Sequence, residues 1–324
     1  MTHAIRIHEH GGSEVMKWET VEVGAPNNNE VRLRHTAVGV NFIDIYHRTG
    51  LYKIPLPTVL GREGAGVIEA VGASVTGLKV GDRVAYGAAP LGSYSEARLI
   101  PADRVVSIPA SVTDQQAASI MLKGMTAQYL LKRSYAVKAG DTILVHAAAG
   151  GVGLILCQWA KSLGVTVIGT VGSEEKGKLA IAHGCDFVIN YSTEDFAARV
   201  GEITGGKKCA AVYDGVGKDT FLKSLDCLRP RGVMASFGNA SGKVEPFDLG
   251  ILAAKGSLYV QRPTLDTHVA TFDDLVATAN DLFDVVGRGI VKVEINQTYA
   301  LKDAAEAHRD LAARKTTGST VLLP

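Results

Sequence analysis

The sequence has few cysteines, and they are scattered. Its 324 residues include four cysteines that lie far apart and form no C-x-x-C pair. This spacing argues against a structural zinc lobe and against a secreted disulfide framework. All stand in apolar surroundings, so we predict buried, packed side chains for Cys157, Cys185, Cys209 and Cys227.

The chain also lacks strong net charge and long apolar runs. Its formal net charge is +1, and its lysines and arginines are dispersed, which does not indicate a nucleic-acid surface. No apolar run approaches the roughly 20 residues of a membrane-spanning helix. The opening residues, MTHAIRIHEHGG, lack the apolar core of a signal peptide. We therefore expect a cytoplasmic protein with no nucleic-acid partner and no membrane insertion.

The composition is that of an ordinary globular protein. Hydrophobic residues make up 46% and charged residues 21% of the chain, enough to bury a large core. A length of 324 residues suggests two domains.

The most informative segment is TILVHAAAGGVG at 142–153, where an apolar run ends in Gly150, Gly151 and Gly153. The segment after it has the apolar spacing of a helix. A strand, a glycine turn and a helix in this order let the backbone approach a pyrophosphate at the positive end of the helix. Ala148 stands where the strict G-x-G-x-x-G pattern needs glycine, and such a turn can also simply end a strand. The context still predicts dinucleotide binding, and with it redox chemistry.

The next strand, 166–171, bears on the choice of cofactor. An NAD site should carry an acid at its end, to hold the ribose 2′-hydroxyl. This chain has Gly172 and Ser173 there, with Lys176 shortly after. A lysine and a hydroxyl would attract a 2′-phosphate, so the pattern favours NADPH. Two glutamates before Lys176 complicate this reading, and Lys176 could also be a solvated helix residue.

Strand and helix patterns alternate through the middle of the chain. The predicted strands after the glycine turn are 166–171, 187–191, 209–214, 232–237 and 257–261, and the helices are 174–183, 193–203, 218–228 and a short one near 249–255. With the strand before the turn they make six strands, which predicts a doubly wound parallel sheet with right-handed crossovers.

The two ends of the chain have a different pattern. The first 120 residues contain short β-type runs between turns, as in a partly open antiparallel barrel. After a helix around 269–286 come a strand VKVEI, a helix LKDAAEAHRDLAAR and a strand TVLLP that could complete a sheet begun near the N-terminus. We predict a β-rich domain, 1–125 plus 265–324, split around a nucleotide domain at 126–264. A substrate would meet the cofactor in the cleft between them.

Many blocks of this chain resemble the medium-chain dehydrogenase/reductase superfamily, and within it the zeta-crystallin type of NADPH:quinone oxidoreductase, especially the bacterial quinone reductases. The blocks are Asn41-Phe42-Ile43-Asp44, Gly50-Leu51-Tyr52, Lys123-Gly124-Met125-Thr126, Gly140-Asp141, Leu144, Ala148-Ala149-Gly150-Gly151, Gly153, Gln158, Lys161, Ser236-Phe237-Gly238-Asn239 and Arg262-Pro263. The resemblance implies a Rossmann-type domain inserted in a GroES-like partly open barrel domain. It also implies NADPH as cofactor, a quinone substrate and a homodimer.

Zinc-dependent members of the superfamily carry a G-H-E block whose histidine binds the metal. Here the block is Gly61-Arg62-Glu63, and a guanidinium cannot ligate a metal. The cysteine ligand expected soon after Val38 is absent, and so is the four-cysteine lobe near 90–100. We predict an enzyme with no metal, in which Glu63 pairs with Arg62 or with a backbone donor.

The resemblance places Asn41, Tyr46 and Tyr52 at the substrate, as the residues closest to the chemistry. An amide and two phenols can bind quinone oxygens while the rings pack on the quinone plane. A phenol of ordinary pKa is a poor acid at neutral pH, so the proton donor stays open. Without the resemblance, both tyrosines would be interpreted as packing residues, and we expect His47 at the surface. One- and two-electron transfer both remain open, and so does the physiological acceptor.

The cofactor contacts come from several segments. The predicted set is Phe42, Ile43, Asp44, Tyr46, Thr126, Ala149, Gly150, Gly151, Val152, Gly172, Ser173, Lys176, Tyr191, Gly215, Phe237, Gly238, Asn239, Ala240, Ser241, Arg262, Pro263 and Arg314. Three of these have plain structural alternatives. Tyr191 could be a strand-end packing residue, Gly215 a simple turn and Arg314 a solvated cation at a helix end.

The strand SLYVQ at 257–261 would lie at an edge of the sheet. An apolar exposed edge invites pairing with a second chain, so we predict a homodimer through this strand, the alternative being an edge covered by the chain's own loop. Two rival functions remain open. One is an NADPH-dependent reductase of alkenal or enone double bonds, and the other is a non-catalytic NADPH-binding protein.

Overall fold

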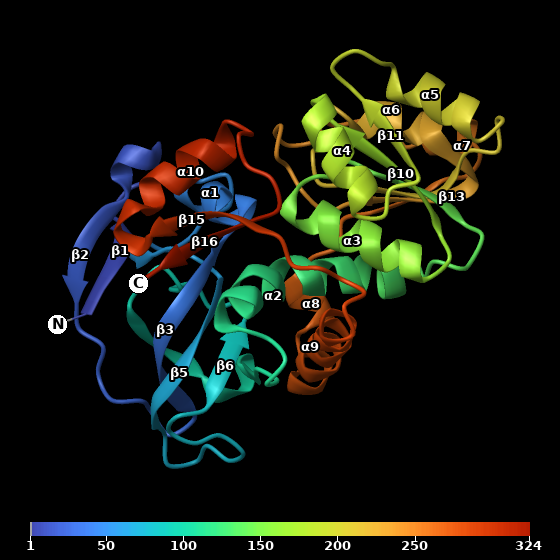
Figure 1. The fold of residues 1–324 in the computed structure, drawn as a ribbon. Helices are drawn as coiled ribbons and strands as arrows, with labels where there is room; N and C mark the ends of the chain where they lie inside the picture. Colours follow the sequence, from blue (N-terminus) through green and yellow to red (C-terminus); the bar gives the residue numbers. More distant parts are fainter. Residues whose placement is uncertain (1) are drawn as a thin grey trace. The chain divides into compact units, whose positions relative to one another are not determined.

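The structure is a computed structural model that describes residues 2–324 (Figure 1). The chain divides into two compact units. Unit 1 takes the residues up to Met125 together with His268–Gly287 and Val293–Pro324, and unit 2 takes Thr126–Thr267 together with Arg288–Lys292.

Unit 1 is built mainly from antiparallel β-structure. A three-stranded sheet has the order β2-β1-β4, and a larger sheet has the order β15-β16-β3-β5-β6-β8, with β7 also paired to β3. Within residues 2–324 neither sheet closes into a barrel, as predicted. The strands are β1 (Thr2–Ile7), β2 (Lys17–Val21), β3 (Glu30–Val40), β4 (Thr58–Val59), β5 (Glu63–Val71), β6 (Arg83–Tyr86), β7 (Ala97–Pro101), β8 (Val106–Ser107), β15 (Ile295–Ala300) and β16 (Ser319–Leu323).

The long strand β3 holds this unit together. Its apolar side chains point mostly inward, and it pairs with β5, β7 and β16. The partnership with β16 runs antiparallel from Thr320 opposite Val40, which confirms that the final strand completes a sheet begun near the N-terminus (Figure 1). The prediction for VKVEI is wrong, because pairing with β16 begins only at Ile295 and continues to Ala300.

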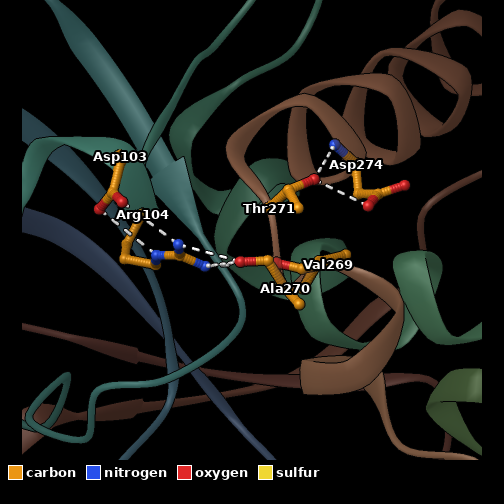
Figure 2. Close-up of polar contacts among 6 residues, drawn as sticks. All are labelled: Asp103, Arg104, Val269, Ala270, Thr271 and Asp274. Atoms are coloured by element: carbon orange, nitrogen blue, oxygen red, sulfur yellow. Dashed lines mark hydrogen bonds and ion pairs between the residues drawn. The ribbon is translucent and has the colours of Figure 1, made fainter.

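The helices of unit 1 are α1 (Phe42–Thr49), most of α2 (Asp114–Tyr129), α9 (Phe272–Gly287) and α10 (Ala304–Ala312), and the short α8 (Leu265–His268) ends at its border. Helix α9 begins at a polar anchor (Figure 2). The Arg104 guanidinium donates hydrogen bonds to the carbonyl oxygens of Val269 (3.3 Å) and Ala270 (3.1 Å). The Thr271 hydroxyl accepts from the Asp274 N–H at 3.1 Å and donates to the Asp274 carboxylate at 2.7 Å. These contacts fix the start of a helix that returns to unit 1 from far along the sequence.

Unit 2 contains a six-stranded parallel sheet of order β11-β10-β9-β12-β13-β14. The order moves outward in opposite directions from β9 and β12, so right-handed crossovers place the connecting helices on opposite faces. This confirms the doubly wound sheet predicted from the sequence. The strands are β9 (Thr142–Val145), β10 (Thr166–Val171), β11 (Phe187–Asn190), β12 (Cys209–Asp214), β13 (Leu228–Ser236) and β14 (Tyr259–Gln261); the helices are α3 (Gly151–Ser162), α4 (Glu174–Ala182), α5 (Phe196–Ile203), α6 (Phe221–Ser224) and α7 (Gly250–Ala254).

One predicted element of unit 2 is much shorter than expected. The helix predicted over 218–228 is reduced to α6, followed by one tight 3-10 turn at Leu225–Cys227. Strand β13 starts directly after it, at Leu228. The apolar residues of this segment pack into the core of unit 2 with Leu144, Ile168 and Met234, so burial rather than helical periodicity explains the pattern.

All four cysteines are buried and reduced, as predicted. Among residues 2–324, no helix has the length and hydropathy needed to cross a membrane.

Candidate active site

The glycine turn after β9 has the geometry of a phosphate cradle. Gly150 precedes the first residue of α3, and a side chain at Gly153 would put its Cβ 2.4 Å from the carbonyl oxygen of Ala147. Only glycine therefore allows the helix to start this close to the turn. The first N–H groups of α3 have no partner within the helix and lie at the carboxyl edge of the sheet, where an anion is stabilised.

The structure explains the departure at Ala148. A Cβ at Gly169 on the neighbouring strand would lie 2.7 Å from the Ala148 methyl group, so the methyl occupies space that Gly169 leaves open. Gly169 on β10 thus makes room for the Ala148 methyl group, and the backbone of the turn does not have to move. The sequence signal for this compensation was a single glycine inside a predicted strand.

The predicted phosphate residues meet at the carboxyl ends of β10 and β11. A Cβ at Gly172 would lie 2.6 Å from the Tyr191 hydroxyl. The Ser173 hydroxyl accepts the backbone N–H of Lys176 at 3.3 Å, which caps α4. Ser192, which sequence reasoning missed, donates its hydroxyl to the Gly172 carbonyl at 3.2 Å. Two hydroxyls and a phenol thus gather around one backbone turn, and Lys176 lies in the first turn of the helix that follows it, a set that suits a phosphate.

The ends of β12 and β13 form a second rigid feature. A Cβ at Gly238 would lie 2.2 Å from the Gly215 carbonyl oxygen, so both loops touch through backbone. The Ala240 N–H donates to the Gly215 carbonyl (3.2 Å), and the Ser241 N–H donates to the Val216 carbonyl (2.8 Å). The predicted residues from 237 to 241 are therefore held beside Gly215.

Four further predicted residues are Arg262, Pro263 and Thr126 in unit 2 and Arg314 in unit 1. Arg262 donates to the Ser236 carbonyl at 2.6 Å, at the end of β13, and Pro263 follows it. Thr126 is buried. Arg314 belongs to unit 1, where it follows α10 with a left-handed φ of 58°.

In unit 1, Asn41 lies next to a buried ion pair. The fully buried Glu63 carboxylate accepts hydrogen bonds from the Asn41 amide (2.8 Å), the Lys123 ammonium (2.8 Å) and the Leu122 backbone N–H (2.7 Å). The expectation that Glu63 bonds a backbone donor is met, but the cation found is Lys123 rather than Arg62. The sequence showed Lys123 only as part of a family block, because 60 residues separate it from Glu63.

Glu63 is the last residue of the Gly61-Arg62-Glu63 block, which resembles the metal-binding block of zinc-dependent dehydrogenases. The polar groups of the cluster around Glu63 are one carboxylate, one ammonium and amide or backbone N–H donors, a set in which the ammonium repels a metal cation. Within residues 2–324 no group of three or more His, Cys, Asp or Glu side chains is placed to hold a metal ion.

Helix α1 and the loop after it carry a cluster of aromatic rings, in which Tyr46 is buried and Phe42 and Tyr52 are half-buried. The rings of Tyr46 and Tyr52 lie 5.2 Å apart in an edge-to-face arrangement, and Phe42 packs 6.3 Å from Tyr46. The Tyr52 N–H donates to the Tyr46 carbonyl at 3.1 Å, which fixes their separation. The prediction for His47 is wrong: it is only 7% exposed, with its ring 6.1 Å from Tyr52.

Asp44 faces the interior. Its carboxylate accepts the Asn41 backbone N–H (2.9 Å), which caps α1, and the Tyr94 hydroxyl (3.0 Å). Burial raises the pKa of Asp44 to about 7. Because the Asp44 side chain is 0% exposed and Tyr46 only 8% exposed, any surface that this segment offers to a cofactor comes mainly from Phe42 and Ile43.

Comparisons with known proteins agree with this geometry. Residues 27–110 match the alcohol dehydrogenase GroES-like domain, and residues 151–279 match the zinc-binding dehydrogenase domain. The chain is 55% identical to a quinone oxidoreductase of Pseudomonas aeruginosa, with full coverage of both chains. It is 48% identical to Escherichia coli quinone oxidoreductase, whose crystal structure in complex with NADPH superposes with a TM-score of 0.98 over all of both chains. A 2-haloacrylate reductase of a Burkholderia species is also 48% identical, over 100% of this chain and 99% of its own.

These likenesses define a two-domain oxidoreductase of the medium-chain dehydrogenase/reductase superfamily. Within that class, the chain belongs to the quinone oxidoreductase family.

Proposed function

We propose that this protein is a zinc-independent NADPH:quinone oxidoreductase. The single observation that carries the proposal is the 55% identity to a quinone oxidoreductase over the whole of both chains. The residues of the candidate site support it, because they fit both a phosphorylated dinucleotide and a flat, polar-edged acceptor.

NADPH would be held mainly by unit 2. Ala149 to Val152 would present backbone N–H groups to the pyrophosphate, where Gly153 leaves no room for a side chain. Ser173, Lys176 and Tyr191 would surround the 2′-phosphate, with Ser192 beside them. The rigid loops at Gly215 and at 237–241 would frame the nicotinamide end.

The acceptor would be oriented by unit 1. Bound NADPH would supply reducing equivalents, as a hydride or as single electrons, and a quinone suits this chemistry because its carbonyls are already electron-poor. Tyr46 and Tyr52 offer aromatic edges and hydroxyls for a planar ring, and the Glu63 carboxylate keeps the Asn41 amide in one orientation. Full reduction of one quinone consumes one NADPH and one proton and yields a hydroquinone.

A second function is favoured by one specific observation. The 2-haloacrylate reductase matches this chain as closely as the Escherichia coli quinone oxidoreductase does, at 48% identity. In that chemistry the hydride would go to the carbon of an activated double bond instead of to a quinone. The same nucleotide site would serve both reactions, so the acceptor decides between them.

The test is an acceptor screen with the purified protein. NADPH oxidation is followed with benzoquinones, with α,β-unsaturated aldehydes and with 2-chloroacrylate. We expect quinones to support the fastest turnover. Turnover with the alkenes alone would refute the proposed function, and tight NADPH binding without oxidation by any acceptor would favour a non-catalytic role. Radical detection during quinone turnover separates one-electron from two-electron transfer.

We further propose a homodimer formed through β14 and a cytoplasmic location. Strand β14 lies at the end of the sheet of unit 2, and Tyr259 on it is 60% exposed. An exposed strand edge with a large aromatic side chain is suited to pairing with a second copy of the chain.

A further inference from the structure

A buried histidine lies directly beneath the glycine turn. His146 follows β9, is 3% exposed and packs its ring edge-to-face 5.0 Å from Phe196. Its Nδ1 lies 2.9 Å from the Thr170 hydroxyl and its Nε2 lies 2.8 Å from the Ser224 hydroxyl. Both ring nitrogens therefore have hydrogen-bond partners within the protein, and the ring is almost completely shielded from solvent.

The hydrogen-bond partners determine the form of the ring. The Ser224 hydroxyl donates its one hydrogen to the Thr220 carbonyl at 2.8 Å, so it must accept from His146 Nε2–H. Nδ1 is then the acceptor for the Thr170 hydroxyl. Burial lowers the pKa of His146, in agreement with a neutral ring. A cationic ring would leave the Thr170 hydroxyl hydrogen without its acceptor.

The residues that follow His146 form the glycine turn that we assign to the pyrophosphate. Ala147 adopts a left-handed φ of 53°, a conformation that a residue with a Cβ rarely adopts. On one side of it, the His146 N–H donates to the Tyr213 carbonyl (3.0 Å), and on the other the Ala148 N–H donates to the Thr170 carbonyl (3.0 Å). Thr170 thus binds the turn through its carbonyl and His146 through its hydroxyl.

The same network reaches the other end of the nucleotide site. Thr220, whose carbonyl accepts the Ser224 hydroxyl, donates its own hydroxyl to the Asp214 carboxylate at 2.7 Å. The other oxygen of that carboxylate accepts the N–H groups of Val216 (2.7 Å) and Gly217 (3.1 Å). Asp214 thereby shapes the loop that contacts Gly238.

We propose that His146 is a positioning residue for NADPH. Through its hydrogen bonds to Thr170 and Ser224, His146 fixes the position of the turn after β9 relative to the loop after β12. The backbone at both ends of the dinucleotide site is then already in place before NADPH binds. The inference rests on the proposed function in one respect, which is that unit 2 binds NADPH.

The experiment compares the same change, threonine to valine, at two positions in unit 2. Thr170→Val removes the hydroxyl that His146 accepts but keeps the carbonyl and the side-chain volume. Thr204→Val removes a hydroxyl that donates to the Val200 carbonyl at 2.7 Å, after α5 and ahead of β12, at the opposite edge of the sheet. NADPH affinity is measured by calorimetric titration, and the KM for NADPH and for a quinone is measured with each variant.

We expect Thr170→Val to weaken NADPH binding about tenfold, the effect of one buried hydrogen bond, and to change the quinone KM less than about twofold. Thr204→Val should leave NADPH affinity unchanged. His146→Gln, which keeps a donor and an acceptor, should bind NADPH more tightly than His146→Leu.

Wild-type affinity in Thr170→Val, or equal losses in Thr170→Val and Thr204→Val, would overturn the positioning role while leaving NADPH binding intact. Equal affinities of the His146→Gln and His146→Leu variants would overturn it as well. If the unmodified protein does not bind NADPH at all, the proposed function fails together with the inference.

Discussion

At the scale of single residues, we propose that Lys176 determines the preference for NADPH over NADH. It sits in the first turn of α4 beside Ser173, and the neighbouring Gly172 turn also holds Tyr191 and Ser192. A lysine recognises a phosphate through charge as well as hydrogen bonding, whereas a ribose hydroxyl gives it little to bind. The cofactor preference can therefore be tested at this one side chain.

We predict that Lys176→Ala weakens NADPH binding by about 10- to 100-fold, the range expected for a charge-assisted hydrogen bond. NADH affinity should stay within about twofold. Lys178→Ala, an exposed lysine on the same helix, is the matched control and should bind both cofactors as the unmodified protein does. Equal losses for NADPH and NADH in Lys176→Ala would contradict the phosphate role.

The buried Glu63–Lys123 pair gives a second prediction at this scale. Glu63→Gln leaves the Lys123 ammonium, only 7% exposed, without its counter-charge, so we expect it to lower the free energy of unfolding by about 3–5 kcal/mol. Glu63→Gln combined with Lys123→Met should recover most of that loss. The matched control is Glu96→Gln at the surface pair with His3, expected to cost less than about 1 kcal/mol in urea denaturation. A double variant no more stable than Glu63→Gln alone would show that the buried charge is not the cause.

Residues whose role is local could be predicted from the sequence, and residues whose role depends on distant partners could not. Gly150, Gly151 and Gly153 predict the turn because its conformation depends on a short segment of neighbouring residues. The Glu63–Lys123 pair and the compensation of Ala148 by Gly169 join different elements, so no short segment contains them. His47 was misplaced for the same reason, since its burial depends on what packs over α1.

At the scale of secondary-structure elements, the strands of unit 2 could be predicted because buried parallel strands are short continuous apolar runs. All five strands predicted after the glycine turn are present, each within a few residues of its expected range. The misjudged elements are α6 and β15. In both, tertiary pairing or core burial, rather than local periodicity, sets the boundary.

The prediction at the scale of elements concerns strand β14 as a dimer contact. We expect the unmodified protein to be a dimer and Tyr259→Lys to be a monomer, because a charge on an exposed edge opposes strand pairing. Leu222→Lys, a comparably charged change at a 49% exposed position on α6, should remain a dimer. The measurement is molar mass by light scattering after size exclusion. A dimeric Tyr259→Lys variant would argue that the contact lies elsewhere.

At the scale of the whole molecule, buried histidines link folding to pH. His35 donates its Nδ1–H to the Ser95 carbonyl (2.7 Å), and its Nε2 accepts from the Tyr86 hydroxyl (2.7 Å). Burial, with a contribution from the nearby Arg98, lowers the pKa of His35 to about 3. The unfolded chain binds a proton here below about pH 6.5 and the folded chain does not, so this contribution to stability is complete above that pH and is lost as the pH falls toward about 3.

We therefore predict that His35→Gln flattens the dependence of stability on pH. Between about pH 6 and pH 4, the free energy of unfolding should fall by up to about 1.4 kcal/mol less per pH unit than in the unmodified protein. Urea denaturation across this range measures the slope. Parallel curves for His35→Gln and the unmodified protein would refute the assignment.

The pairing of β16 with β3 has a consequence for synthesis on the ribosome. The sheet of unit 2 comes from one uninterrupted stretch, Thr126–Thr267, and all six of its strands emerge before β15 and β16 are translated. Until then, the edge of β3 that β16 later occupies, from Val38 to Val40, has no partner strand and is open to mispairing. During synthesis, the whole sheet of unit 2 is therefore present in the nascent chain before unit 1 acquires β16, the strand that completes its larger sheet.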